Sequence, residues 1–400
     1  MLKNILNSLL VEETTSNKST SSLIKEQKKP KIKIIYIGSG ACNILESIYS
    51  DNTKNTNFDS ENIISYAISS DSSNIRKLYG KVNTWTLGYD LLYGNGAGCN
   101  FKNGEQAAIN DTKKISEIIS NCDLCVIVSC LGKGTGSGAT PVIAKIAQEQ
   151  ERKTIAILTM PNKIEGTIIC QNAKKSLEEI DTYVDSLCVI NDIENASTNN
   201  KDEKKSLFEA TNTTIKNLIH TLSEFVIVSD YRKSNFADLV NFINNNKYFS
   251  FFYFNNENIE EKVLKNKDLF SNEKTSNATN ILVDFEFSRD ENQILIFDQF
   301  KNFFCNNFRN IATLIKKITV TSFEEKKYIG IFYSINNLQL ENNLDNGTII
   351  NLQQNVDNKR ISCVDFDINS KNCIEEFIEK NKLKKNTIKI DDFFKAENNK

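Results

Sequence analysis

A glycine-rich run at residues 132–141, Gly-Lys-Gly-Thr-Gly-Ser-Gly-Ala-Thr-Pro, constrains the fold of this chain more than any other feature. It lies between an apolar segment, Leu124 to Ser129, and a helical pattern from Pro141 to about Gln150. Small residues let backbone N–H groups approach an anion closely, and the following helix N-terminus favours negative charge. Glycine-rich runs also occur in ordinary surface turns. The order of strand, glycine turn and helix nevertheless favours a phosphate site in an α/β protein.

Composition narrows the class of protein. A chain of 400 residues with 40% hydrophobic content exceeds the roughly 250 to 300 residues at which single cores stop growing, which predicts two domains. The 49 basic and 51 acidic residues leave a net charge of −2, so no overall field favours nucleic acid. Ten scattered cysteines, several of them in apolar strands, indicate a reducing cytosol. Cys122 and Cys125 form one CxxC without a second pair at zinc spacing, so we expect no metal centre.

The chain has no apolar run of the length that a membrane helix needs, so we expect no membrane span. The start of the chain also lacks the apolar stretch of a signal peptide. Both observations predict a cytoplasmic protein.

Two more turns of small residues follow predicted strands. Strand Lys33 to Ile37 leads into the turn 38–43, and a third glycine-rich segment occupies residues 94–100. Strand Ile63 to Ser69 ends near Asp71, an acid that can contact a ribose or a water-bound cation, or simply cap a turn. Because the carboxyl ends of parallel strands meet at one edge of a sheet, we expect these turns to converge there.

Further strands and helices alternate along the chain. Strands Lys153 to Thr159 and Ser186 to Ile190 precede a long helix from about Lys205 to Phe225. Near-continuous apolar strands alternating with helices predict a parallel sheet covered on both faces. Residues 230–275, which are rich in asparagine and interrupted by aromatic residues, predict further helices and a loop. Strands near 281–335 around a helix at about 297–308 predict a smaller α+β second domain.

These motifs, taken in order, resemble the tubulin/FtsZ family, whose bacterial members assemble the division ring. The run 132–141 is similar to the family signature G-G-G-T-G-S/T-G, and residues 94–100 are similar to its G-x-G-A-G-x-N. Pro161 with Glu165-Gly166 resembles P-x-x-x-E-G, and residues 185–192 resemble D-S-L-x-x-x-x-N-D. Residues 235–238, Asn-Phe-Ala-Asp, resemble the end of the family's synergy loop. The resemblance covers roughly residues 31–336.

The resemblance implies a tubulin/FtsZ-like α/β fold with a parallel-sheet nucleotide-binding domain, a long central helix and a smaller α+β second domain. The implied parts are a partly disordered N-terminal extension (1–30), a GTP-binding domain (31–204), the central helix (205–226), the synergy loop and connecting helices (227–275), the C-terminal domain (276–336), a linker-like tail (337–387) and a C-terminal peptide (388–400).

The resemblance also implies a GTPase whose active site is divided between successive subunits of a head-to-tail filament. The ligand would be GTP or GDP, with Mg²⁺ carried by the nucleotide. The implied nucleotide-binding residues are Gly38, Gly40, Asn43, Asp71, Gly96, Ala97, Gly98, Gly132, Gly134, Thr135, Gly136, Ser137, Gly138, Glu165, Asn191, Phe208 and Asn212. The implied catalytic residues are Asp238 and Asn235, which would position the attacking water from the neighbouring subunit.

Several residues depart from the family pattern. Ser39, Ala41 and Cys42 interrupt the glycines of the first turn, and Lys133 replaces a signature glycine with a cation that can meet phosphate oxygens. Apolar Ile169 replaces the family's arginine that meets the ribose and phosphate. Thr213 stands where the family reads guanine with an aspartate, which predicts weaker discrimination against adenine. Asn235 replaces one of two synergy-loop acids, which predicts slow hydrolysis.

The sequence is also compatible with two other functions. A structural relative could bind nucleotide and co-assemble without hydrolysing it. A nicotinamide-dependent oxidoreductase is suggested only by Gly38-Ser39-Gly40, and two further glycine turns argue against it. The C-terminal segment 388–395 loosely resembles the family's peptide that binds division adaptors or membrane tethers. We expect no nucleic-acid partner.

Overall fold

The structure is a computed structural model that describes residues 29–50, 61–162, 165–190, 201–227, 236–255, 280–288, 313–321, 328–334, 353–354 and 360–361. Asn191, Asn235, the predicted helix near 297–308 and the C-terminal peptide lie outside the described residues. The side chain of Phe208 is likewise not described.

A six-stranded sheet forms the first layer of the fold, and all of its pairings are parallel. The strands run in the spatial order β3-β2-β1-β4-β5-β6. Their bounds are β1 Ile32–Ile37, β2 Ile63–Ser69, β3 Asn83–Thr86, β4 Leu124–Cys130, β5 Lys153–Thr159 and β6 Ser186–Ile190. The predicted parallel sheet is confirmed, with one strand, β3, that the sequence analysis does not predict.

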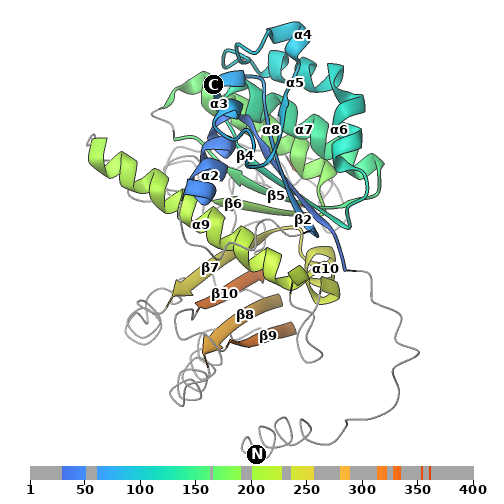
Figure 1. Cartoon of the computed structure of the whole chain (residues 1–400), viewed down its shortest axis with the longest axis vertical. Coiled ribbons are helices and arrows are strands. Elements are labelled where there is room, and N and C mark those ends of the chain that lie inside the picture. The colour runs from blue at the N-terminus through green and yellow to red at the C-terminus, as the bar shows by residue number, and fades with distance from the viewer. Residues whose placement is uncertain are drawn as a thin grey trace, which may run out of the picture.

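Helices cover both faces of this sheet (Figure 1). The helices are α2 Gly38–Ser50, α3 Ser72–Arg76, α4 Tyr89–Leu92, α5 Phe101–Asn110, α6 Thr112–Ile119, α7 Gly134–Glu149, α8 Thr167–Tyr183, α9 Lys201–Ile227 and α10 Phe236–Asn245. Alternate residues of β1 serve the two faces: Ile35 and Ile37 pack with α5 to α8, whereas Ile34 and Tyr36 pack with α2 and α9. Burial on both sides explains why the strands are apolar throughout.

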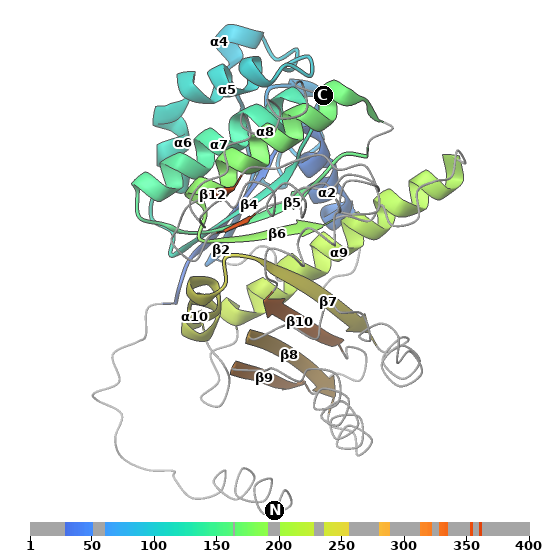
Figure 2. The same ribbon diagram turned by 180° about the vertical axis from the view of Figure 1, so that it is seen from behind.

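A second sheet lies on the other side of α9 (Figures 1 and 2). Its strands, in the order β7-β10-β8-β9, are β7 Phe249–Asn255, β8 Asn280–Ser288, β9 Thr313–Thr321 and β10 Tyr328–Ser334. Strand β10 pairs antiparallel with β7 and β8, and β8 pairs parallel with β9. A short hairpin, β11 Gln353–Gln354 with β12 Arg360–Ile361, completes the described strands.

Strand β7 corrects the prediction of helices and a loop over residues 230–275. Helix α10 is present, but the segment after it is a strand of the second sheet. Four of its seven residues are phenylalanines, and aromatic side chains favour the pleated, half-buried surface of a sheet. Phe249 and Phe251 pack against Phe332 of β10, with ring centroids 6.0 and 5.0 Å apart.

The glycine-rich run also differs from its prediction, because helix α7 begins at Gly134 instead of Pro141. Likewise, α2 begins at Gly38, directly after β1, with no intervening turn. Isolated glycines disfavour helix, but packing of α7 into the core stabilises it, since residues 134–141 are all buried.

Pro141 therefore lies inside a helix, where it lacks the N–H that would bond the carbonyl of Ser137. The hydroxyl of Ser176, which is fully buried on α8, donates to that carbonyl at 2.7 Å. Helix α8 thus satisfies the acceptor that the proline leaves open.

We predict that Ser176→Ala lowers the free energy of unfolding by about 1–3 kcal/mol, because it leaves a buried carbonyl without a donor. Urea unfolding followed by circular dichroism measures the change. Pro141→Ala restores a backbone N–H at position 141, so in that background Ser176→Ala should cost clearly less. Equal costs in the two backgrounds would show that this hydrogen bond is not the reason for the serine.

Candidate functional site

The predicted convergence of the three turns is confirmed. The start of α2 lies against the start of α7, since a Cβ on Gly38 would be 3.0 Å from the nitrogen of Gly136. The hydroxyls of Ser70, after β2, and Thr135, in α7, lie 2.5 Å apart. Asp71 forms a β-bridge with Asn95 of the third turn. The carboxyl ends of β1, β2 and β4 therefore bring these segments to one edge of the sheet, called here the glycine-turn edge.

Most of the signature glycines are required by packing. A Cβ on Gly134 would lie 2.6 Å from the carbonyl oxygen of Asn100, and one on Gly136 would lie 2.5 Å from that of Cys130. Gly138 faces the carbonyl of Phe101 in the same way, and Gly40 of α2 faces the side chain of Cys130. These glycines let α2 and α7 approach β4 and α5 closely, so their role is to bring the helices into place.

The two helix N-termini at this edge suit an anion. The first N–H groups of a helix have no partner within it and carry partial positive charge. Lys133, the residue that precedes α7, makes no side-chain bond to cap them. Gly98 of the third turn is exposed, with φ +60° and open space where a Cβ would be. Gly96 has space nearly as open, with only Asp71 at contact distance.

Side chains hold the turns to one another. The fully buried hydroxyl of Ser137 accepts from the backbone N–H of Gly132 at 2.6 Å, so Ser137 shapes the turn from within. Sequence reasoning missed Asn172 of α8, whose amide donates to the carbonyls of Cys99 at 2.9 Å and Gly132 at 3.1 Å. It links the third turn to the signature run, and no local pattern indicates such a long-range partner.

Asp71 orders the turn that follows β2, called here the second turn. Its carboxylate accepts from the backbone N–H of Ser73 at 2.9 Å and from the amide of Asn74 at 2.8 Å, and it thereby caps α3. The same Asn74 amide donates to Ser39 at 2.8 Å. Ser39, which interrupts the glycines of the first turn, is thus joined to the second turn.

Glu165 lies at this edge beside α8. Its carboxylate accepts from the backbone N–H of Asn162 at 2.9 Å, and the side chain is exposed. Burial raises the pKa of the Cys130 thiol; among the nearby charges, Glu165 raises this pKa and Lys133 lowers it. Ile169 fills the space beside Gly132, where a Cβ would lie 2.5 Å from its Cγ2 atom.

The other predicted binding residues differ in exposure and in their contacts. Asn43 is exposed on α2, whereas Ala97 of the third turn is buried. Asn212 is half-buried on α9, and no described hydrogen bond joins it to the glycine turns. The hydroxyl of Thr213 donates to the carbonyl of Glu209 at 2.8 Å. Its proton is therefore already used within the helix.

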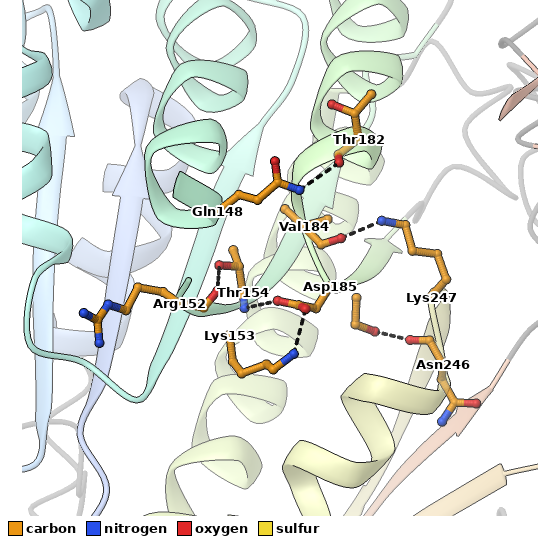
Figure 3. Close-up of polar contacts among 10 residues, drawn as sticks. Gln148, Arg152, Lys153, Thr154, Thr182, Val184, Asp185, Asn246 and Lys247 are labelled. Carbon is orange, nitrogen blue, oxygen red and sulfur yellow. Dashed lines mark hydrogen bonds and ion pairs between the residues drawn. The ribbon is translucent and has the colours of Figure 1, made fainter. Parts of the chain in front are cut away.

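Asp238 belongs to the opposite edge of the sheet. It is half-buried in the first turn of α10. The segment after α10 is bound to the start of β6: the carbonyl of Asn246 accepts from Ser186 at 2.6 Å, and Lys247 donates to the carbonyl of Val184 at 2.6 Å (Figure 3). Figure 1 shows α10 at the end of the sheet away from α3. One molecule therefore keeps Asp238 far from its own glycine turns.

None of the described helices combines the length and hydropathy that crossing a bilayer requires. The described His, Cys, Asp and Glu side chains form no cluster of three or more that could hold a metal ion.

Comparison with known sequences extends this picture. The model of the Tubulin/FtsZ family, GTPase domain, matches residues 31–199. The cell division protein FtsZ of Aquifex aeolicus is 33% identical over 211 residues, which are 52% of this chain and 55% of that protein. The mitochondrial division protein fszB of Dictyostelium discoideum is 28% identical over 248 residues, 61% of this chain and 66% of that protein. The chain thus spans about half the length of the bacterial relatives it matches.

Solved structures share the fold. An empty FtsZ dimer from M. jannaschii aligns with a TM-score of 0.63 at 22% identity, over 83% of this chain and 91% of that one. CetZ2 from Haloferax volcanii, described as a GTPγS-bound protofilament, aligns with a TM-score of 0.58 at 16% identity, over 76% and 92%. Residues 31–199 therefore match the GTPase domain of the Tubulin/FtsZ family, and the two-sheet fold is shared with the FtsZ and CetZ structures.

Proposed function

We propose that this protein is a self-assembling GTPase, in which each copy holds GTP on its glycine-turn edge and the next copy supplies Asp238. The observation that carries the proposal is the separation of the two halves of the site. The turns follow the carboxyl ends of β1, β2 and β4, whereas α10 is bound to the amino end of β6. Head-to-tail stacking of copies would bring these edges together. The family match and the relative described as a GTPγS-bound protofilament support this arrangement.

The glycine-turn edge would hold the phosphates through the N–H groups of α2, α7 and the third turn. Mg²⁺, bound with the nucleotide, would neutralise phosphate charge. Asp71 is the carboxylate that we propose meets its water shell, because the Asp71 backbone is bridged to Asn95 of the third turn and Asn74 holds the carboxylate in the turn after β2. Glu165 would meet the ribose, and Asn191, Phe208 and Asn212 would meet guanine.

Asp238 would accept a hydrogen bond from the attacking water and stabilise the positive charge that develops on it. Asn235 can orient the water but carries no charge, so hydrolysis would be slow. These roles rest on the sequence resemblance and on the position of α10.

A second candidate is a relative that binds nucleotide and co-assembles without hydrolysis. The substitution of Asn235 for an acid favours it. Phosphate release measured above the assembly concentration separates the two candidates, because only the first produces phosphate under conditions where filaments scatter light.

For cellular role, we propose bacterial cell division, in the cytoplasm at the division site. The segment 388–400 would bind an adaptor or membrane tether there. This part of the proposal rests on the sequence resemblance of the tail and on relatives named as division proteins.

We predict that saturating GTP slows maleimide labelling of Cys99 about tenfold or more, since an occupied site shields the third turn. Cys99 is exposed at that turn. Cys42 is the internal control, because it is 1% exposed and burial, with smaller contributions from Cys130 and Asp71, raises its thiol pKa to about 12. It should stay unlabelled at pH 8 until urea unfolds the protein. Equal Cys99 rates with and without GTP would argue against the site.

We predict that Asp238→Ala lowers phosphate release by about 10²-fold or more, because it removes the remaining acid. GTP affinity should stay within about twofold. Asp238 lies at the opposite edge from the turns that would bind nucleotide, so it would make no contact with the nucleotide of its own copy. Asn235→Asp should raise release by about tenfold or more. A malachite-green assay beside fluorescent-nucleotide titration measures both quantities. Loss of GTP affinity in Asp238→Ala would contradict the division of the site between copies.

A further inference from the structure

Lys133 is the one exposed residue in the run 131–141, whose other members are all buried. It immediately precedes α7, with extended backbone angles of φ −86° and ψ 167°, and its side chain makes no capping bond. Among the described residues, the ion pairs do not include Lys133. Lys133 therefore carries its ammonium group on an exposed, flexible side chain at the start of α7.

This is an unfavourable place for a cation in the free protein. The N-terminus of a helix carries partial positive charge, and the residue before it is most often Ser, Thr, Asp or Asn, which bond the first N–H groups. Helix α2 also begins at this edge, against Gly136, and adds a second positive end. Glu165 is a nearby carboxylate whose charge, like that of Lys133, reaches Cys130. That carboxylate, however, already accepts from Asn162.

Local rules broken together at one residue indicate a functional site. In the free protein, the Lys133 ammonium group is repelled by the positive N-termini of α2 and α7. An anion bound between the two helices would attract the ammonium group and both N-termini. The ammonium group is a compact charge with three donors, suited to phosphate oxygens without demanding one geometry. The same lysine then lowers the stability of the free protein and raises its affinity for the ligand.

We propose that Lys133 is a phosphate-contacting residue that raises the affinity of this edge for the nucleotide and lowers the stability of the nucleotide-free protein. This inference rests on the proposed function. A glycine at position 133 would offer the ligand only its backbone N–H, whereas lysine adds a positive charge.

The test compares Lys133→Ser, Lys133→Arg and the control Lys145→Ser in the full chain. Lys145 lies on the same helix α7, with its side chain 55% exposed and 4.0 Å from Glu149, and it controls for the loss of one positive charge. Affinities for GTP and for inorganic tripolyphosphate are measured by calorimetry, and thermal unfolding is measured without ligand.

Lys133→Ser should weaken GTP binding about tenfold or more, equivalent to about 1.4 kcal/mol. Lys133→Arg should stay within about threefold of the unchanged protein, and Lys145→Ser within about twofold. Without ligand, Lys133→Ser should unfold about 2–4 °C higher, because serine caps α7 and the repulsion is gone. A purely structural role for Lys133 predicts lower stability of this variant instead.

Unchanged GTP affinity in Lys133→Ser, or failure of arginine to restore it, would overturn the inference while leaving the proposed function intact. If the unchanged protein bound no GTP, the proposed function would fail. In that case, weaker tripolyphosphate binding by Lys133→Ser would still support the phosphate contact. If the protein bound neither GTP nor tripolyphosphate, the inference would be wrong.

Discussion

The closeness of α7 to its neighbours is the constraint on which the candidate site depends. A methyl group on Gly134 or Gly136 would lie within 2.6 Å of a backbone oxygen of the third turn or of β4. Such an approach is possible only for glycine, and overpacking of this kind destabilises a core. The same contacts bring the start of α7 beside the start of α2 and the turns after β2 and β3. The signature glycines therefore act first through packing. The edge can bind an anion because this packing places the N-termini of α2 and α7 side by side.

Five of the six strands of the first sheet follow from the sequence, because a strand buried on both faces is apolar throughout and polar residues mark its ends. Strand β3, Asn-Thr-Trp-Thr, lacks that pattern and is not predicted. Lys153–Thr159 and Ser186–Ile190 were predicted with the bounds observed. The start of α7 could not be predicted, since glycine has low helix propensity and only contacts with α5 and β4 explain the helix. Convergence of the turns followed from parallel topology. The bridge made by Asn172 joins residues 73 and 40 positions away, and no local pattern contains such a distance.

Residues that break a local rule in this structure are matched by a partner on another element. Pro141 removes a helix N–H, and Ser176 of α8 donates in its place. Ser39 interrupts a glycine turn, and Asn74 bonds it to Asp71. Lys133 differs from these, because no described residue pairs with it in an ion pair and its natural partner is an anion from outside the chain. This contrast separates structural compensation from a position shaped for a ligand.

The attachment of α10 to the start of β6 gives any head-to-tail assembly of this protein a direction. One end presents the glycine turns, and the other presents Asp238 of α10. In the assembly proposed above, the subunit at the first end has no neighbour to complete its site. Its triphosphate would outlast those of the interior, so a filament would carry a tip chemically distinct from its shaft. Slow turnover would lengthen that tip, and the lifetime of filaments would then depend on a single asparagine.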